Sequence, residues 1–372
     1  MSKKTLRFLL VISMLVLFVS ACQYSGATEI AKVPITPTSL AVATQAPTVV
    51  PTQTVIPATI APTDAPIPVV ISSQNISHLK QIYQIPVQYP YRLVWTADGR
   101  RLLTASSDSV FVINPQTGAV LTTYAVAAPI ALVDISPDGK TAALLKNPTT
   151  LELVDVTSGV VERSITLPGA NQNGAFSPDG SQLALTSSDE YAVSIWDVAS
   201  GTQKQTLKGF ESASPVYGVH FSMDGKYIIW VARAQVQVQN IETGKLGASL
   251  SHEEFVSAAV LSPDSSVMAV GAAGTVGGTY TPFIRLWDPQ KGLQLADLIT
   301  TQMPILAYSP DGKILAAGSA TSIVFFDTST RLQIYMVTGP TDSISNLAFS
   351  PDGTRLAVAS ADSTVRIWML VP

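Results

Sequence analysis

The sequence has few of the residues on which catalytic and metal sites usually depend. Its 372 residues include one cysteine and three histidines, and 13% of them are charged. A single cysteine excludes an internal disulfide, and the scattered His78, His220 and His252 match neither a zinc-binding pattern nor a Cys–His pair. The chain also lacks a Gly-x-Ser-x-Gly elbow, a phosphate-binding loop and a calcium-binding loop. We therefore expect no enzymatic activity, no catalytic residues, no bound metal and no cofactor.

Basic residues are also scarce, whereas glycine and proline are frequent. Lys and Arg total 22 against 26 Asp and Glu, which gives a net charge of −4. Because nucleic-acid-binding proteins present a basic surface, this balance excludes nucleic acid as the expected partner. The 23 glycines and 25 prolines suit many short strands joined by turns better than a helical fold.

The single cysteine lies at the end of an N-terminal leader. Three basic residues within the first seven positions precede an apolar stretch over residues 8–19, which is too short to span a bilayer comfortably. Residues 19–22 (Val-Ser-Ala-Cys) resemble the lipobox of bacterial lipoproteins. The resemblance implies a signal peptide over residues 1–21, a lipid on Cys22, and a location in the cell envelope outside the cytoplasmic membrane. The alternatives are an ordinary signal peptide with an incidental cysteine and an uncleaved anchor.

Residues 22–73 form a second region, in which proline and threonine alternate almost without charge. Proline at this density favours extended polyproline II, with a reach of about 3 Å per residue. We expect a disordered stalk that holds the following domain away from the membrane. Plain disorder without a spacing role is the alternative, and the sequence does not show whether the threonines carry sugars.

A turn motif recurs seven times from residue 74 to the C-terminus, and its complete form is Ser-Pro-Asp-Gly. Pro sets φ at one corner, Asp can bond the backbone ahead, and Gly can adopt a positive φ. A period of 40 to 47 residues with several strands per unit predicts propeller blades. The aspartates of the seven copies are Asp98, Asp138, Asp179, Asp224, Asp264, Asp311 and Asp352.

Each unit predicts four short strands, but the seventh unit ends after its third. An apolar strand leads into the turn, two more follow, and the fourth alternates as a half-exposed strand does. We expect residues 76–85 to supply the missing fourth strand and close the ring. The predicted fold is therefore an all-β, seven-bladed propeller of four-stranded antiparallel blades over residues 74–372. In the fifth unit Ser265 replaces the turn glycine, where we expect backbone strain.

The repeat resembles the WD-repeat β-propeller family, most completely over residues 175–197 and 349–368. The motifs that carry the resemblance are Phe-Ser-Pro-Asp-Gly, Ser-x-Asp and Ile-Trp-Asp. It implies a rigid, mostly non-catalytic, monomeric platform for protein partners. It also implies a buried network of His, Ser or Thr, Asp and Trp, which no unit here carries complete. Beside Ser187 and Ser360, the residues assigned to this structural role are Asp189, Trp196, Trp287, Asp362 and Trp368.

Two groups of residues depart from the repeat. Asp134 and His220 stand on first strands where the other units have small apolar residues. They could face the central channel and bind a ligand or cation, although we favour their satisfaction by backbone groups or water. The long loops of blades 4 and 5 (209–215, 251–255 and 274–282) could form a recognition patch. Its candidates are Phe210, Glu211, His252, Glu253, Glu254 and Tyr280.

These features together predict a lipid-anchored, cell-surface propeller that acts as a protein-interaction scaffold. The sequence does not identify the protein partner. The alternative is an envelope propeller that binds a small ligand or a metal, with or without hydrolytic activity, through Asp134 and His220.

Overall fold

The computed structural model describes residues 69–371, except residues 107, 126–130, 188–190, 209–215, 223, 233, 252–255 and 277–278. The leader, Cys22 and nearly all of the Pro/Thr-rich stretch lie outside the described residues, so their assignments stay predictions. In the part of the chain that is described, no helix is long and apolar enough to cross a membrane.

The described residues form seven four-stranded antiparallel sheets, which we call blades 1 to 7. Blade 1 comprises β2 (Arg92–Trp95), β3 (Leu102–Ala105), β4 (Ser109–Ile113) and β5 (Val120–Ala125), and blade 2 comprises β6 (Ala131–Ile135), β7 (Thr141–Asn147), β8 (Thr150–Asp155) and β9 (Val161–Thr166). Blade 3 comprises β10 (Asn171–Phe176), β11 (Gln182–Ser187), β12 (Ala192–Asp197) and β13 (Thr202–Lys208), and blade 4 comprises β14 (Val216–Phe221), β15 (Tyr227–Ala232), β16 (Gln235–Asn240) and β17 (Leu246–Ser251).

Blades 5 to 7 follow the same order, except that the fourth strand of blade 7 comes from a segment that precedes blade 1 in the sequence. Blade 5 comprises β18 (Val256–Leu261), β19 (Met268–Val276), β20 (Thr279–Asp288) and β21 (Leu293–Ile299), and blade 6 comprises β22 (Ile305–Tyr308), β23 (Ile314–Ser319), β24 (Ser322–Asp327) and β25 (Gln333–Thr338). Blade 7 comprises β26 (Ile344–Phe349), β27 (Arg355–Ser360), β28 (Thr364–Leu370) and β1 (Leu79–Pro86).

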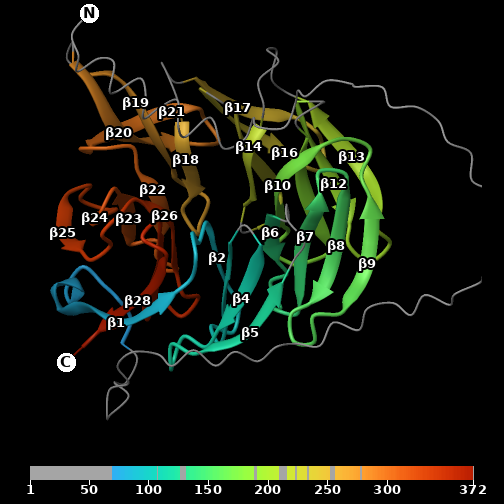
Figure 1. Ribbon diagram of the computed structural model, residues 1–372. Coiled ribbons are helices and arrows are strands. Elements are labelled where there is room, and N and C mark those ends of the chain that lie inside the picture. The colour runs from blue at the N-terminus through green and yellow to red at the C-terminus, as the bar shows by residue number, and fades with distance from the viewer. Residues whose placement is uncertain are drawn as a thin grey trace, which may run out of the picture. The chain divides into compact units, whose positions relative to one another are not determined.

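The blades form a closed ring (Figure 1). The first strand of each blade is innermost, since β2, β6, β10, β14, β18, β22 and β26 each contact the first strands of both neighbouring blades. The fourth strands lie at the outer edges of the sheets. This arrangement confirms the predicted seven-bladed propeller.

The first described strand closes the ring in blade 7, as predicted. In Figure 1 the blue β1 lies beside the red β28, and the two pair antiparallel from Leu79 with Leu370 to Pro86 with Thr364. The pairing gives β28 a partner and joins the two ends of the propeller within one sheet. An open strand edge at this point would otherwise favour association with other chains.

The closing segment differs from the prediction at its first residues. Residues 76–78 form the short 3-10 helix η1 (Ile76–His78), so the strand begins at Leu79 rather than at residue 76. The side-chain oxygen of Asn75 accepts a hydrogen bond from the Ser72 backbone amide at 2.8 Å. Such local bonds favour a turn over strand pairing. His78, which the sequence placed on the closing strand, lies in this helix.

The recurring turns position the first two strands of each blade. In blade 7 the Ser350 hydroxyl donates to Asp352 at 2.5 Å, and Gly353 has a φ of +68°. In blade 5 Ser265 occupies the glycine position with a φ of +58°. A positive φ on a non-glycine residue agrees with the strain that we predict for this turn.

The segment expected to be a long loop in blade 5 is mostly paired strand. β19 and β20 have nine and ten residues, and their ladder continues to Val276 opposite Thr279. Residues 274–282 therefore extend a hairpin, apart from residues 277–278, which lie outside the described residues. The β-branched and aromatic residues of this segment explain the pairing, because they favour strands over irregular loops.

Candidate functional site

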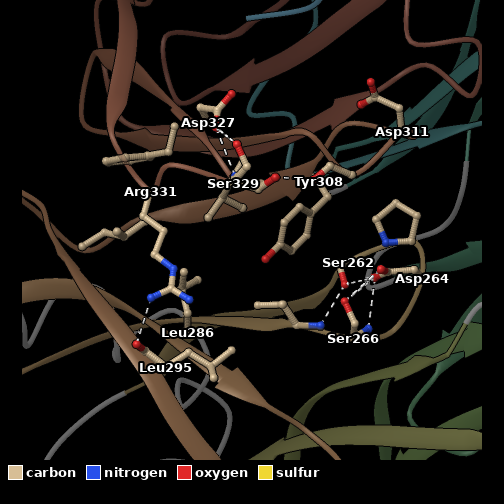
Figure 2. Close-up of a pocket in the computed structure, with 17 residues that line it drawn as sticks. Ser262, Asp264, Ser266, Leu286, Leu295, Tyr308, Asp311, Asp327, Ser329 and Arg331 are labelled. Atoms are coloured by element: carbon tan, nitrogen blue, oxygen red, sulfur yellow. Dashed lines mark hydrogen bonds between the residues drawn. The ribbon is translucent and has the colours of Figure 1, made fainter.

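A pocket of about 270 Å³ lies between blades 5 and 6 (Figure 2). We call it the blade 5–6 pocket. Its apolar walls come from both blades and consist mainly of Val267, Leu286, Leu298, Leu315 and Phe326. Its polar rim is built by turns that connect the strands and includes Asp264, Ser266, Asp311, Asp327, Ser329 and Arg331.

In several other crevices between blades, a long side chain crosses from the outer strand of one blade to the next blade. It donates a hydrogen bond to a backbone carbonyl in the turn that precedes the next outer strand. Because each such side chain fills space and satisfies a carbonyl, it joins neighbouring blades. The bonds are Tyr83 Oη to Gln116 O (2.6 Å), Arg163 Nη2 to Ala199 O (2.7 Å) and Gln205 Nε2 to Ile241 O (3.1 Å).

Blade 5 lacks this crossing side chain. The register of β20 with β21 pairs Ala296 with Leu286, just as the register of β12 with β13 pairs Gln205 with Ile195. Ala296 therefore stands at the crossing position, and its methyl group is too short to reach blade 6. Among the described residues, this crevice therefore has no crossing bond from the outer strand of blade 5. Blade 4 also has an alanine at this position, Ala248 opposite Val238, so an alanine here does not by itself account for the pocket. Blade 1 has a short residue at this position too, Thr122, but there the Tyr124 hydroxyl donates to Val156 O of blade 2.

Arg331 marks the pocket by a second departure from the repeat. The turn between the third and fourth strands has a glycine with a φ of +65° to +72° in blades 1 to 5: Gly118, Gly159, Gly201, Gly244 and Gly292. Arg331 occupies this position in blade 6 with a φ of +63°. Its guanidinium donates to Leu295 O at 3.1 Å, so it reaches back to blade 5 at the rim (Figure 2).

Tyr308 directs a hydroxyl group into the pocket (Figure 2). The corresponding residue of blade 7 is Phe349, which has no hydroxyl. Burial, reinforced by the negative charge of Asp264, raises the pKa of Tyr308, so the group stays protonated. None of the described residues supplies a hydrogen-bond partner to this hydroxyl. It is therefore available to a group that enters the pocket.

The rim carries more negative than positive charge. Hydrogen bonds from Ser262 and Ser329 lower the pKa values of Asp264 and Asp327, respectively, so both are ionised at neutral pH. Neither forms an ion pair with the residues that the structure describes. Arg331 is the cation of the rim; it lies in the same turn as Asp327 and across the pocket from Asp264.

The outer strands on both sides of the pocket expose large apolar side chains. They belong to β21 or lie in and next to β25, and between 37% and 65% of each is exposed. The fourth strand of blade 3, with the sequence Thr-Gln-Lys-Gln-Thr-Leu-Lys, is polar by contrast. The exposed residues, which we call the blade 5–6 strip, are Leu293, Leu295, Ile299, Leu332 and Met336.

The channel candidates lie in a polar cluster on the innermost strands. Asp134 of blade 2 accepts a hydrogen bond from the Phe176 backbone amide at 2.9 Å, and its carboxylate lies 3.9 Å from the Arg92 guanidinium. Arg92 extends from blade 1 to Asn173 of blade 3, with a bond of 3.0 Å. Asp134 is thus held by a backbone amide and lies beside a cation. Sequence analysis did not single out Arg92, although a lone charge on the otherwise apolar β2 could have indicated this cluster.

The enclosed inner strands shift the ionisation of both candidates. Burial raises the pKa of Asp134, and the Arg92 charge opposes that rise. His220 is exposed on an inner strand, although the neighbouring strands still desolvate its imidazole. This desolvation, with the charge of Arg92, lowers its pKa to about 4. His220 is therefore neutral at pH 7. Across the described residues, no three His, Cys, Asp or Glu side chains come together as a metal site.

The assumed Ser–Asp–Trp network has different partners in the structure. The indole N–H of Trp196 donates to Ser194 at 2.8 Å rather than to Ser187. Asp362 forms an ion pair with Arg366 at 2.8 Å and accepts the Thr341 backbone amide. Arg366 and Thr364 compete successfully for Asp362 because they share its hairpin, whereas the indole nitrogen of Trp368 has no partner among the described residues. Trp287 is buried, and Asp189 lies outside the described residues.

The loop patch is only partly visible. Phe210, Glu211, His252, Glu253 and Glu254 lie outside the described residues. Tyr280 lies on β20 with 52% of its surface exposed. The structure therefore does not show whether these candidates come together.

Comparison with known proteins identifies one repeat of this ring. The family model of the WD domain, G-beta repeat (WD40), matches residues 331–369, which span β25 to β28. No curated protein matches the chain. Together with the seven four-stranded blades, the match supports a WD-repeat propeller. Such propellers are commonly non-catalytic scaffolds for protein partners.

Proposed function

We propose that this protein is a lipid-anchored propeller of the bacterial cell surface that serves as a scaffold for a protein partner. The observation that carries the proposal is the blade 5–6 strip. Apolar side chains concentrated on neighbouring outer strands of a rigid ring are typical of a surface that another protein covers. The WD40 match agrees with such a role.

The anchor rests on the leader sequence and on Cys22. A thioether-linked diacyl group supplies two chains, which is enough for stable membrane attachment. We expect the wild-type protein in the membrane fraction and the Cys22→Ser variant in the soluble or unprocessed fraction. Mass spectrometry of the N-terminal peptide should show the acyl groups. An unmodified Cys22 in a processed wild-type chain would contradict the anchor.

The scaffold role is tested by cross-linking on intact cells. Leu332→Glu and Met336→Glu together place two charges on the blade 5–6 strip and should abolish specific cross-links to a protein partner. Leu121→Glu is the matched control, because Leu121 is 46% exposed on the outer strand of blade 1. Cross-links that persist in the double variant, or that disappear equally in the control, would argue against this surface.

A second candidate function is binding of a small ligand or metal in the central channel. It is favoured by the cluster of Arg92, Asp134, Asn173 and His220. The guanidinium makes an anionic or carboxylate ligand a better match than a free cation. Native mass spectrometry tests this candidate: a bound anionic species in the wild type that is absent from Arg92→Gln would support it.

A further inference from the structure

We propose that the blade 5–6 pocket receives an aliphatic side chain from an extended segment of the partner protein. The inference rests on the proposed scaffold function and deepens it by naming the docking point. The neighbouring crevice, between blades 6 and 7, holds such a side chain.

The crevice between blades 6 and 7 is filled by Ile71. This residue precedes all of the strands, is 1% exposed, and packs in the same apolar cluster as residues of both blades. Its backbone amide donates to Gly353 O of the blade 7 turn at 2.9 Å. An extended segment from outside the blades thus inserts one aliphatic side chain between two of them.

The walls of the two crevices correspond position by position. The strand registers relate each apolar wall residue of the blade 5–6 pocket to a member of the Ile71 cluster. On the side of the lower-numbered blade, Val267, Leu286 and Leu298 correspond to Ile314, Phe325 and Val337. On the other side, Tyr308, Leu315 and Phe326 correspond to Phe349, Leu356 and Trp368. The pocket is therefore the Ile71 site of the next crevice, without its side chain.

The size of the pocket suits this occupant. Its volume of about 270 Å³ leaves room for one side chain of the size of Ile71. Apolar walls of this kind gain most from an apolar occupant. By analogy with Ile71, which is held by the blade 7 turn, the segment would enter beside the blade 6 turn at Gly312, which lines the pocket.

Two differences from the Ile71 site define the partner further. The Tyr308 hydroxyl can donate to a backbone carbonyl of the entering segment, a bond that Phe349 cannot make. Asp264 and Asp327 at the rim favour a basic residue beside the aliphatic one and disfavour an acidic one. The exposed Leu293 and Leu295 continue the apolar contact along the outer strand.

The test uses a peptide with the sequence of residues 69–75 (Val-Val-Ile-Ser-Ser-Gln-Asn), followed by a lysine, as the probe. The protein is the chain with Cys22→Ser, in which the blade 6–7 crevice is already filled by its own Ile71. Isothermal titration should show one site, and a peptide with aspartate in place of isoleucine should not bind. Absence of binding by the first peptide would overturn the proposal.

Matched variants locate the site. Val267→Trp places a bulky side chain in the pocket from its blade 5 wall and should weaken binding at least tenfold, whereas Thr141→Trp makes the equivalent change in blade 2 and should have no effect. Ala296→Tyr recreates the crossing Tyr335, which coexists with Ile71, and should leave binding unchanged. Tyr308→Phe, a nearly isosteric change, should weaken binding three- to tenfold, and it tests the site if Val267→Trp does not fold. Undiminished binding in both Val267→Trp and Tyr308→Phe would overturn the assignment.

Two further outcomes separate this inference from the scaffold function. If cellular cross-links are lost in the strip variant but persist in Val267→Trp, the scaffold stands and the pocket is not its docking point. If sedimentation shows self-association that Val267→Trp abolishes, the occupant is a second copy, and the assignment to a different protein is wrong.

Discussion

Two neighbouring crevices of one ring have nearly the same walls but different contents. Between blades 6 and 7, Ile71 fills the space and Tyr335 crosses to Ser77 O at 3.2 Å. Between blades 5 and 6, Ala296 stands at the crossing position and a pocket remains. The walls repeat because the blades repeat, whereas the contents depend on residues that do not.

The difference shows that a propeller crevice is a preformed site for one side chain. The ring closes with β1, and the same N-terminal segment supplies Ile71, so the blade 6–7 crevice is filled as part of folding. No described segment of the chain places a side chain like that of Ile71 in the blade 5–6 crevice. Its apolar walls therefore remain available to another molecule. A second pocket, of about 310 Å³, lies beside Ile71 at the rim of the blade 6–7 crevice.

The largest loss of stability is expected from removal of the Asp362–Arg366 ion pair in blade 7. Asp362→Ala removes the partner of the nearly buried Arg366 and should lower the free energy of unfolding by about 3–5 kcal/mol in chemical denaturation. Asp362→Asn should cost less, because it keeps some hydrogen bonds. A change below about 1 kcal/mol in Asp362→Ala would show that the closed crevice does not depend on this ion pair.

The same group also predicts a pH dependence. Burial alone would raise the pKa of Asp362, but hydrogen bonds from Thr364, Thr341 and Arg366 outweigh it and lower the pKa below the value of an unfolded chain. Its stabilisation is complete above the unfolded pKa of about 4 and is lost as pH falls through the folded value. The Asp362→Asn variant should lack this part of the acid dependence in denaturation curves between pH 5 and 2.

Emptying the filled crevice should make it resemble its neighbour. Ile71→Ala deletes a buried side chain and should reduce the free energy of unfolding by about 2–4 kcal/mol. Val70→Ala is the control, because Val70 is 49% exposed and its truncation should change stability by less than about 0.5 kcal/mol. Equal effects of the two substitutions would mean that Ile71 does not fill the crevice.

A substitution at the crossing position of the blade 5–6 crevice should change the free energy of unfolding in the opposite direction. Ala296→Tyr should raise the free energy of unfolding by about 1 kcal/mol, because a carbonyl of blade 6 gains a donor. Thr122→Tyr should give no gain, since Tyr124 already crosses that crevice. Destabilisation by Ala296→Tyr in thermal melts would contradict the correspondence between the crevices.

The smallest effect concerns the turn beside the pocket. Ser265→Gly relieves a positive φ and should raise the Tm by about 1–2 °C, after the entropic cost of glycine is subtracted. Gly225→Ser is the reverse change in blade 4, where the added Cβ would have only ordinary contacts, and should lower the Tm. An unchanged Tm in both variants would argue against strain at this position.

The sequence by itself determined the architecture. The turn motif and its period predicted seven blades, and the missing fourth strand of the last unit predicted closure by the N-terminal segment. These inferences succeeded because turns and strand alternation are local properties of the chain. The error at residues 76–78 came from Asn75, whose side-chain bonds define a turn that an apolar pattern does not reveal.

Only the tertiary structure shows which crevice between blades holds the blade 5–6 pocket. The pocket depends on Leu298 of one blade meeting Arg331 and Tyr308 of the next, and on Ile71 reaching a crevice built by strands near the other end of the chain. Likewise, Asp134 is held by Arg92, and Arg92 extends past blade 2 to Asn173. A repeat pattern shows what each blade has in common. Which side chains meet between blades depends on strand register and on the closed ring, because these bring distant residues into contact.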